Sequence, residues 1–322
     1  MRHIITGGSG FTGSVLTRSL LKKGEMVVNI DIRAQKNLNL TEGVQFINGD
    51  IRDPATMEKA ELNEGDVIYH LAARQFADAV PKINRENWFN DVNVNGTQNV
   101  ITAMQKTGAH QLIFFSTDMT YGLPTTCPVS PDHSQIPLGP YGKSKVAAES
   151  IIRNALSVNA TIFRPRLITG PGRLGVLGKL FKLIKSGLPV PMIGNGNNRY
   201  QMVDVSDCVK AAELAVAKGC PNLNLNLGSA TPPTTKELLK EVILHAKSKS
   251  VLLPVPSIFI KPLLALMDNV GLTLLYPEQF GIADKDVLLD TTLTKSALSW
   301  EPSKNDIDAM CQAYDTFLNS SE

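Results

Sequence analysis

The 322-residue sequence has few cysteines, few aromatic residues and almost no excess of charge of either sign. Its four cysteines, Cys127, Cys208, Cys220 and Cys311, are scattered and never form a CxxC pair, and the five histidines do not cluster with them. This pattern excludes a disulfide framework and predicts no metal site. A formal net charge of +2 gives no reason to expect a nucleic-acid or membrane partner.

The sequence also lacks a long uninterrupted apolar run. The most apolar stretch, residues 251–272, is broken by Pro254, Pro256, Pro262 and Lys261, so it holds no continuous span of about 20 apolar residues. No basic and then apolar leader opens the chain, because glycines begin at residue 7. We therefore expect a cytoplasmic protein without a membrane partner, in which this stretch is a buried helix or a pocket wall.

What the sequence does contain is an alternation of short apolar runs and helix-length segments. It predicts strands at 3–6, 26–30, 44–48, 66–72, 111–116 and 160–163, and helices at 15–23, 88–106 and 141–156. Buried strands separated by crossovers indicate an α/β protein with a doubly wound parallel sheet. Beyond residue 165 the alternation weakens and prolines and glycines accumulate, which indicates a smaller C-terminal domain over 166–322. Residues of about 200–230 are expected to return to the first domain, 1–165.

The segment TGGSGFTG, residues 6–13, joins the first predicted strand to the first predicted helix. Glycine at 7, 10 and 13 suits a tight turn whose backbone approaches a pyrophosphate at a helix N-terminus. A dinucleotide is the ligand that this arrangement favours. The predicted contacts in the turn are Gly7, Gly10, Phe11, Thr12 and Gly13.

Asp31 ends the second predicted strand, where a carboxylate can accept hydrogen bonds from both ribose hydroxyls. Taken alone it would be a solvated residue at a strand end, but after the glycine turn it favours NAD over NADP. Arg33 keeps NADP open as an alternative. Asp50 and Ile51, in GDIRD, are expected beside the adenine. The small residues after the fourth strand, expected to pass close to the cofactor, are Leu71, Ala72 and Ala73.

The segment PYGKSK, residues 140–145, places Tyr141 and Lys145 on one face of a helix. It lies one step beyond the fifth strand, which ends at Ser116 and Thr117. An ammonium near a phenol favours the phenolate, so Tyr141 is expected to exchange a proton nearer neutral pH. Thr117 is expected to hydrogen-bond the same substrate oxygen while a hydride moves to nicotinamide.

At this point the sequence resembles the extended short-chain dehydrogenase/reductase superfamily, in its NAD-dependent epimerase/dehydratase branch. The resemblance rests on TGGSGFTG, GDIRD, HLAA, NVNGT, STDMTYG, PYGKSK, RPRLITGPG and DVSD, and covers nearly the whole chain. It implies a Rossmann-type NAD domain and a smaller substrate-binding domain. It also implies Tyr141 as acid and base, Lys145 and Pro165 at the nicotinamide end, Thr117 on the reacting oxygen, and Asn93 as a brace of the site.

Two departures from the branch narrow the reaction and the substrate. Met119 stands where sugar-nucleotide 4,6-dehydratases have a glutamate base, so elimination is disfavoured. Leu167, in RPRL, stands where many nucleotide-sugar enzymes have an asparagine. The candidate contacts for an anionic substrate are Arg166, Arg173 and Arg199. Lys179, Lys182 and Lys185 are better explained as a solvated helix face.

We therefore expect a reversible oxidation of a secondary alcohol, with C4 of a nucleotide sugar as the leading substrate position and epimerisation as the leading outcome. A net dehydrogenase or reductase remains open, acting on a nucleotide sugar or on a hydrophobic alcohol of the 3β-hydroxysteroid kind. A non-catalytic cofactor-binding protein on the same fold is the other alternative. The helices at 88–106 and 141–156 resemble those that pair in dimers of this superfamily, so a homodimer is expected.

Overall fold

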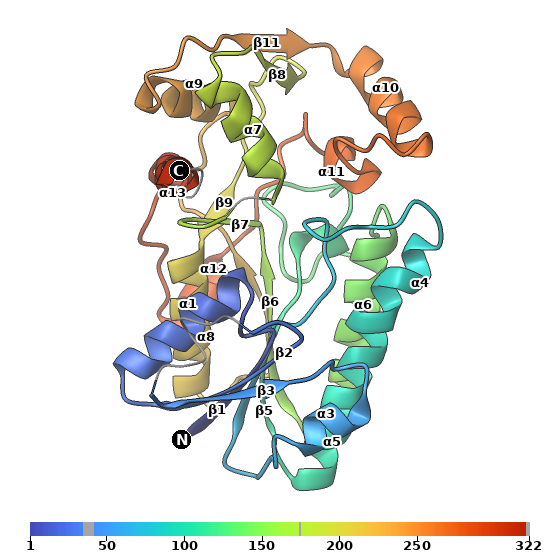
Figure 1. Cartoon of the computed structure of the whole chain (residues 1–322), viewed down its shortest axis with the longest axis vertical. Helices are drawn as coiled ribbons and strands as arrows, with labels where there is room; N and C mark the ends of the chain where they lie inside the picture. The colour runs from blue at the N-terminus through green and yellow to red at the C-terminus, as the bar shows by residue number, and fades with distance from the viewer. Residues whose placement is uncertain (35–41, 174, 320–322) are drawn as a thin grey trace.

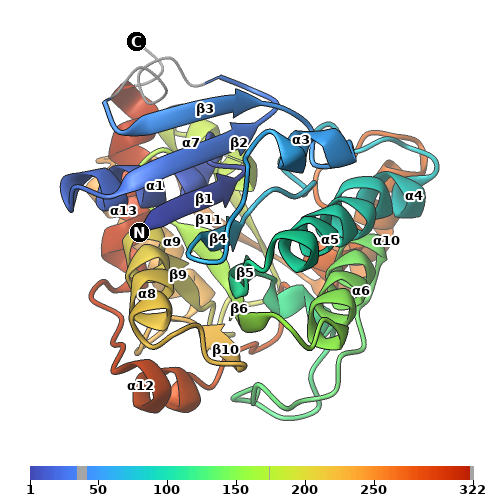
Figure 2. The ribbon, with the colours of Figure 1, turned by 90° about the horizontal axis from the view of Figure 1, so that it is seen from below.

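The computed structural model describes residues 1–34, 42–173 and 175–319. Its centre is a seven-stranded sheet of parallel strands in the order β10-β6-β5-β4-β1-β2-β3 (Figure 2). The strands are β1 (Arg2–Thr6), β2 (Met26–Asp31), β3 (Val44–Asn48), β4 (Val67–His70), β5 (Gln111–Phe115), β6 (Asn159–Pro165) and β10 (Asn224–Leu227). The order reverses between β1 and β4, which confirms the predicted doubly wound Rossmann-type sheet.

Both faces of this sheet carry helices, as Figure 2 shows. On one face lie α3 (Pro54–Glu58), α4 (Arg85–Asn90), α5 (Thr97–Thr107) and α6 (Pro140–Asn154). On the other lie α1 (Phe11–Lys22) and α8 (Val205–Ala217), with α12 (Thr292–Leu298) beside α8. Neighbouring residues of one strand point to opposite faces of the sheet. Ile4 packs in the core under α5 and α6, and Ile5 packs in the core under α1 and α8. Strands buried on both faces explain their uniformly apolar sequences.

The helix predicted over residues 88–106 is present but contains a π-helical segment. It begins at Arg85 as α4, passes through a π-helical turn, η1 (Asp91–Gly96), and continues as α5. A π-helical turn inserts an extra residue into a helix and often lies at a functional site. Here it contains the predicted site residue Asn93.

The remaining elements lie mainly beyond the carboxyl edge of the sheet, in the upper half of Figure 1. They are η2 (Asp118–Thr120), β7 (Leu167–Thr169), α7 (Gly175–Lys185), β8 (Val190–Ile193), β9 (Met202–Asp204), α9 (Thr235–His245), β11 (Leu252–Val255), α10 (Ser257–Asn269), α11 (Pro277–Gly281) and α13 (Asp306–Asn319). A separate apolar core, which includes Phe181, Leu238 and Phe317, joins α7, α9 and α13. None of the helices in the described ranges has the length and apolarity needed to cross a membrane.

A buried ion pair attaches α6 to the sheet. The guanidinium of Arg164 in β6 donates to both carboxylate oxygens of Glu149 in α6, at 3.0 and 2.6 Å. Both side chains are at most 2% exposed. Although burial acts to raise it, Arg164 holds the pKa of Glu149 below its usual range. The pair therefore stays ionised inside the protein, with each charge compensating the other.

Replacing Glu149 by glutamine should destabilise the fold strongly, because Arg164 would keep its charge in a buried position without a carboxylate. We expect the free energy of unfolding to fall by about 3 kcal/mol. Urea denaturation measures it. The control is Lys295→Gln, which breaks the solvent-facing pair with Glu301 and should cost no more than about 0.5 kcal/mol. Equal, small losses in both variants would contradict a structural role for the buried pair.

Candidate active site

A cavity of about 1080 Å³ lies along the carboxyl edge of the main sheet and extends between it and the C-terminal elements. It brings together nearly all of the predicted site residues. Those that line it are Gly7, Gly10, Phe11, Thr12, Gly13, Asp31, Arg33, Asp50, Ile51, Leu71, Ala72, Ala73, Thr117, Tyr141, Lys145, Pro165, Arg166 and Arg173. Asn93 and Arg199 are not among the lining residues. A cavity at the switch point of a doubly wound sheet is where ligands of such folds bind.

The glycine turn between β1 and α1 is packed backbone against backbone. Gly7 has a φ of +75°, and a Cβ there would lie 2.7 Å from the backbone nitrogen of Ala72. A Cβ on Gly13 would overlap the carbonyl oxygen of Gly7 and lie 2.6 Å from the Cα of Gly8. Only glycine allows the strand exit, the turn and the start of α1 to approach this closely. The N–H groups at the start of α1 are thereby presented to the cavity, where they suit a pyrophosphate.

The Asp31 carboxylate is fixed at the end of β2. One oxygen accepts the backbone N–H of Ser9 and the other that of Arg33, each at 3.0 Å. Burial raises the pKa of Asp31, although these two hydrogen bonds act in the opposite direction. An oriented carboxylate beside the glycine turn suits the hydroxyls of a ribose. Glycine turn, helix N-terminus and carboxylate together fit a dinucleotide such as NAD.

Asp50 and Ile51 both line the cavity, but Asp50 is ion-paired and Ile51 is buried. Asp50 is paired with the Arg52 side chain at 2.7 Å, and this contact lowers its pKa. Ile51 is buried in the core under α3 and α5. Ile51 therefore offers an apolar surface at the cavity wall, and Asp50 a carboxylate whose charge is already compensated.

Thr117, Tyr141 and Lys145 all line this cavity. Tyr141 stands in the first turn of α6, with the rings of Phe76 and Phe89 at centroid distances of 5.1 and 5.5 Å. The ammonium of Lys145, one helical turn later, lies 4.1 Å from the ring centroid of Phe114. Thr117, at the end of β5, accepts the N–H of Met119 through its hydroxyl. The strand end and the helix start thus place a phenol, an amine and a hydroxyl together.

The expectation that Lys145 lowers the pKa of Tyr141 is wrong for this structure. Burial raises the pKa of Tyr141, and the charges of Glu278 and Asp118 raise it further. Burial also lowers the pKa of Lys145, to about 7. The cause is common to both groups, since a site enclosed by aromatic rings disfavours any charged form. Burial therefore favours the neutral phenol of Tyr141 over the phenolate.

Glu278 is a site residue that the sequence did not reveal. It lies in α11, and its two carboxylate oxygens accept the N–H groups of Tyr141 and Gly142, both at 3.0 Å. The side chain is 4% exposed, and burial raises its pKa. The carboxylate meets the positive end of the α6 dipole and satisfies two unpaired N–H groups there. No local signal could have indicated this contact across 136 residues.

The three predicted arginines differ in their surroundings. Arg166 is buried and paired with Asp118, its guanidinium carbon lies 5.0 Å from the ring centroid of Tyr200, and its Nε has no hydrogen-bond partner in the described chain. Arg173 lies against the Phe11 ring at 5.4 Å, and no carboxylate of the described residues is within ion-pair distance. Arg199 is half exposed and pairs with Asp286 outside the cavity.

Asn93 lies behind the cavity wall. It is 2% exposed, and its amide joins two elements that do line the cavity. The side-chain oxygen accepts the N–H of Arg74 at 2.8 Å, while the side-chain nitrogen donates to the Ser144 hydroxyl at 2.9 Å and to the Arg74 carbonyl at 3.1 Å. This geometry ties the exit of β4 to α6, beside Lys145.

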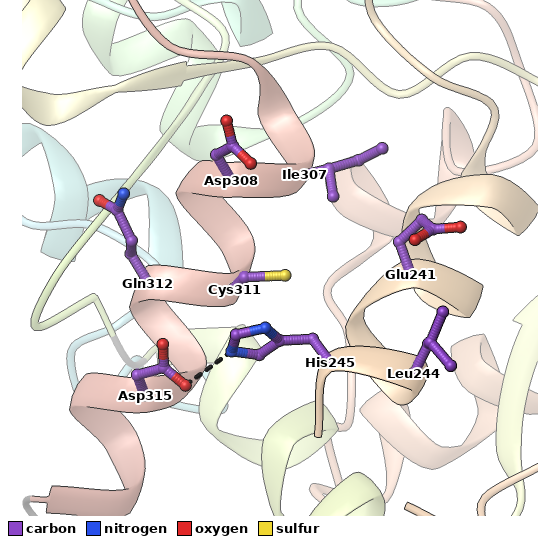
Figure 3. Close-up of a pocket in the computed structure, with 8 residues that line it drawn as sticks. All are labelled: Glu241, Leu244, His245, Ile307, Asp308, Cys311, Gln312 and Asp315. Atoms are coloured by element: carbon purple, nitrogen blue, oxygen red, sulfur yellow. Dashed lines mark hydrogen bonds and ion pairs between the residues drawn. The ribbon is translucent and has the colours of Figure 1, made fainter. Parts of the chain in front are cut away.

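A second pocket, shown in Figure 3, lies on the surface between α9 and α13. His245 and Asp315 pair across it at 2.7 Å, and Cys311 points into it. None of the predicted site residues lines it. No group of three metal-ligating side chains occurs in the described ranges, here or elsewhere.

Fold and site together define the class. A Rossmann-type sheet, a glycine turn with an acidic strand end, and a Tyr/Lys pair on the helix after β5 make this an NAD-dependent enzyme of the extended short-chain dehydrogenase/reductase type. The chain belongs to the NAD-dependent epimerase/dehydratase family, whose model matches residues 3–228. Membership confirms the family predicted from the motifs and NAD as the cofactor.

Individual relatives agree with this assignment. The chain is 30% identical over 253 residues to a putative UDP-glucose 4-epimerase of Methanocaldococcus jannaschii, covering 75% of this chain and 81% of the relative. It is 32% identical over 271 residues to the N-acetyl-alpha-D-glucosaminyl-diphospho-ditrans,octacis-undecaprenol 4-epimerase of Escherichia coli O157:H7, covering 79% and 75%. Its fold is similar to that of the Bordetella bronchiseptica enzyme WbmG in complex with NAD, with a TM-score of 0.80, 25% identity and coverage of 99% and 94%.

Substituting Gly13 by alanine should impair NAD binding, because the new Cβ would force the turn away from the start of α1. We expect the dissociation constant for NAD to rise at least about tenfold, measured by isothermal titration calorimetry. Gly65→Ala is the matched control, since its Cβ would meet nothing closer than 3.4 Å. Unchanged binding in the Gly13 variant would rule out a requirement for this close approach.

Proposed function

We propose that this protein is an NAD-dependent epimerase that reversibly oxidises a secondary alcohol, with C4 of a nucleotide sugar as the reacting position. The observation that carries this proposal is the meeting of Thr117, Tyr141 and Lys145 in one cavity with the glycine turn and two buried arginines. The relatives that act on UDP-glucose or on a diphosphate-linked amino sugar support the substrate class.

The cofactor would lie along the edge of the sheet. Its pyrophosphate would meet the turn from Gly7 to Gly13, its adenosine ribose Asp31, and its adenine Ile51. The segment from Leu71 to Ala73 and Pro165 would flank the other half. When bound, NAD takes a hydride from the alcohol carbon and returns it.

The chain's own residues handle the proton and the oxygen. Tyr141, as the phenolate, would take the hydroxyl proton as the alcohol becomes a ketone, and the phenol so formed would give the proton back when the ketone is reduced on its other face. Thr117 would donate a hydrogen bond to the same oxygen and hold it at the phenol. Burial lowers the pKa of Lys145 to about 7. A phenolate at Tyr141 would favour the protonated ammonium of Lys145, which would stabilise the phenolate in turn. Asn93 would keep the Lys145 helix in register with β4.

The substrate's diphosphate would lie against Arg173 and Arg166. Arg173 has no carboxylate partner among the described residues, and the buried Arg166 Nε is a donor without an acceptor. Buried donors without partners are costly unless a ligand completes them. The pair of Arg199 with Asp286 keeps that arginine occupied, so a contact with the diphosphate would first require this pair to open.

Elimination by a dehydratase mechanism is disfavoured. Met119 supplies no carboxylate that could act as a base, and the carboxylate of Asp118 is paired with Arg166.

A net dehydrogenase or reductase is the second candidate. It is favoured by the apolar side chains that line the far part of the cavity, among them Leu167, Leu177 and Leu180, because these would suit a hydrophobic alcohol or ketone.

Three organisational proposals accompany this function. Residues from 166 onward would supply most of the substrate-binding domain, with α8 and β10 returning to the NAD domain 1–165. The outer faces of α4, α5 and α6 would pair in a homodimer, which sedimentation can test. The reaction would take place in the cytoplasm.

Replacing Tyr141 by phenylalanine should abolish turnover and preserve NAD binding, because only the phenolic proton is lost. We expect kcat to fall by about a thousandfold. The assay offers UDP-, dTDP-, GDP- and CDP-sugars and follows both NADH absorbance and product stereochemistry. Inversion without net NADH supports the epimerase, whereas stoichiometric NADH supports the second candidate. Full activity in the variant would refute the proton-transfer role.

Glu278→Gln should shift the pH dependence of kcat/KM, because the variant removes a negative charge that raises the pKa of Tyr141. With that pKa lowered, the phenolate forms at lower pH, so the acidic limb of the profile should move to lower pH. Glu278→Asp retains the charge and should leave the limb near its wild-type position even where kcat falls. An unmoved limb in the glutamine variant would limit Glu278 to holding the backbone of α6.

A further inference from the structure

Helix α10 exposes mostly apolar side chains, while its charged side chains face the protein. Its exposed side chains recur at the spacing of a single helix face, and apart from Asn269 they are apolar: Ile258, Phe259, Pro262, Leu263 and Leu266, with Val270 directly after the helix. Ile258 and Phe259 are 74% and 72% exposed. A helix on the surface of a globular protein ordinarily directs such a stripe toward the core.

The charged side chains of the same helix face inward and are paired. Lys261 binds Asp284 at 2.6 Å and the carbonyl oxygen of Gly281. Asp268 is held by both guanidinium nitrogens of Arg85, at 2.6 and 2.8 Å. These bonds fix the rotation of α10, so its apolar face is held outward by the fold.

The exposed apolar surface extends beyond α10. Nine of the 20 large apolar side chains that the described residues expose fall within positions 251–274. They include Val251 and Leu253 at β11, and Leu272 and Leu274 after α10. We call the exposed apolar side chains of residues 251–274 the apolar cap. An exposed apolar surface of this concentration marks an interaction site.

The apolar cap lies at one end of the molecule. Figure 1 shows β11 and α10 along the top of the C-terminal elements, at the opposite end from the lower edge of the main sheet. The cap also reaches the active-site cavity, because Leu274 is half exposed and lines that cavity as well. A flat partner that covers this end would therefore border the cavity.

Lysines lie beside the apolar cap, and its own stretch of sequence has no exposed acid. Lys247 and Lys249 are exposed just before β11, and the stem of Lys82 packs on Gly271. Between residues 242 and 277 the only acidic residue is Asp268, which is 7% exposed and paired with Arg85. Apolar side chains bordered by lysines suit the acyl chains and anionic headgroups of a lipid bilayer.

We propose that the apolar cap docks on the anionic surface of a lipid bilayer, with the side chains of α10 inserted at the headgroup level. Charge favours the bilayer over a second copy of the chain, because a twofold contact would bring the lysines beside the cap close to their own counterparts. The expectation that residues 251–272 form a buried helix or a pocket wall is wrong, because the apolar face of α10 is exposed and none of these residues lines the cavity. The sequence showed that prolines break the stretch, but not that its apolar side chains face outward.

The experiment is co-sedimentation of the full chain with vesicles of phosphatidylcholine alone and with about 30% phosphatidylglycerol. Binding is expected to the anionic vesicles and should weaken with added salt. In the double variant Ile258→Glu/Phe259→Glu, the affinity should fall by at least about tenfold. Both positions are exposed, so the fold should be kept, which circular dichroism checks.

Two matched variants separate the contributions. Leu156→Glu makes the same chemical change at a 93% exposed site between α6 and β6, at the opposite edge of the sheet, and should bind like the wild type. Lys247→Gln/Lys249→Gln should weaken binding to anionic vesicles only. Absence of vesicle binding would overturn the proposal, and so would an equal loss in the Leu156 variant. Oligomers that dissociate in the Ile258/Phe259 variant, without vesicle binding, would assign the cap to protein contacts instead.

Discussion

The buried pair between Glu149 and Arg164 is the interaction on which the active site depends. Glu149 also accepts the hydroxyl of Ser116, the residue before Thr117, and Arg164 donates to the carbonyl oxygen of Pro131 and to the Tyr121 hydroxyl. Tyr121 in turn donates to Asn226 of β10 at 2.7 Å. One ion pair thus sets the position of α6, the end of β5 and the outer strand of the sheet relative to one another. The cost of burying two charges is offset by a fully satisfied set of partners.

Burial shifts the pKa values of Tyr141 and Lys145 more than any ion pair does. Tyr141 packs against the rings of Phe76 and Phe89. Lys145 packs against Phe114, and burial moves the pKa values of both groups toward the neutral forms. Two carboxylates, Glu278 and Asp118, add to this effect on Tyr141. Arg173 lies against the Phe11 ring without a carboxylate partner in the described chain. The cavity thus places a protonated phenol and an unpaired guanidinium on its wall.

The positions of the glycine turn and of Asp31 on the cavity wall could be predicted because their signals are local. Strand, glycine turn and helix are contiguous in residues 2–22, and Asp31 follows at the end of the next strand. The glycines are required by the packing of the turn in which they stand, so the sequence around them is enough to predict that turn. The Tyr141/Lys145 pair was recognisable for the same reason. Glu278 and the Arg199–Asp286 pair were not, because each depends on a contact across the chain. The orientation of α10 was equally hidden, since it is set by Arg85 and Asp284.

The C-terminal segment explains why the catalytic half cannot be specified locally. Asp268 is tied to Arg85, the Tyr276 ring stacks on Phe76 at 4.7 Å, and Glu278 holds the backbone of Tyr141. Phe76 itself touches the Tyr141 ring, so these contacts converge on one residue from both sides. Residues 268–278 therefore connect the inner face of α10 to the start of α6. A displacement of this segment would change the position of Tyr141 and its pKa together, because the carboxylate that orients the helix is also one that disfavours the phenolate.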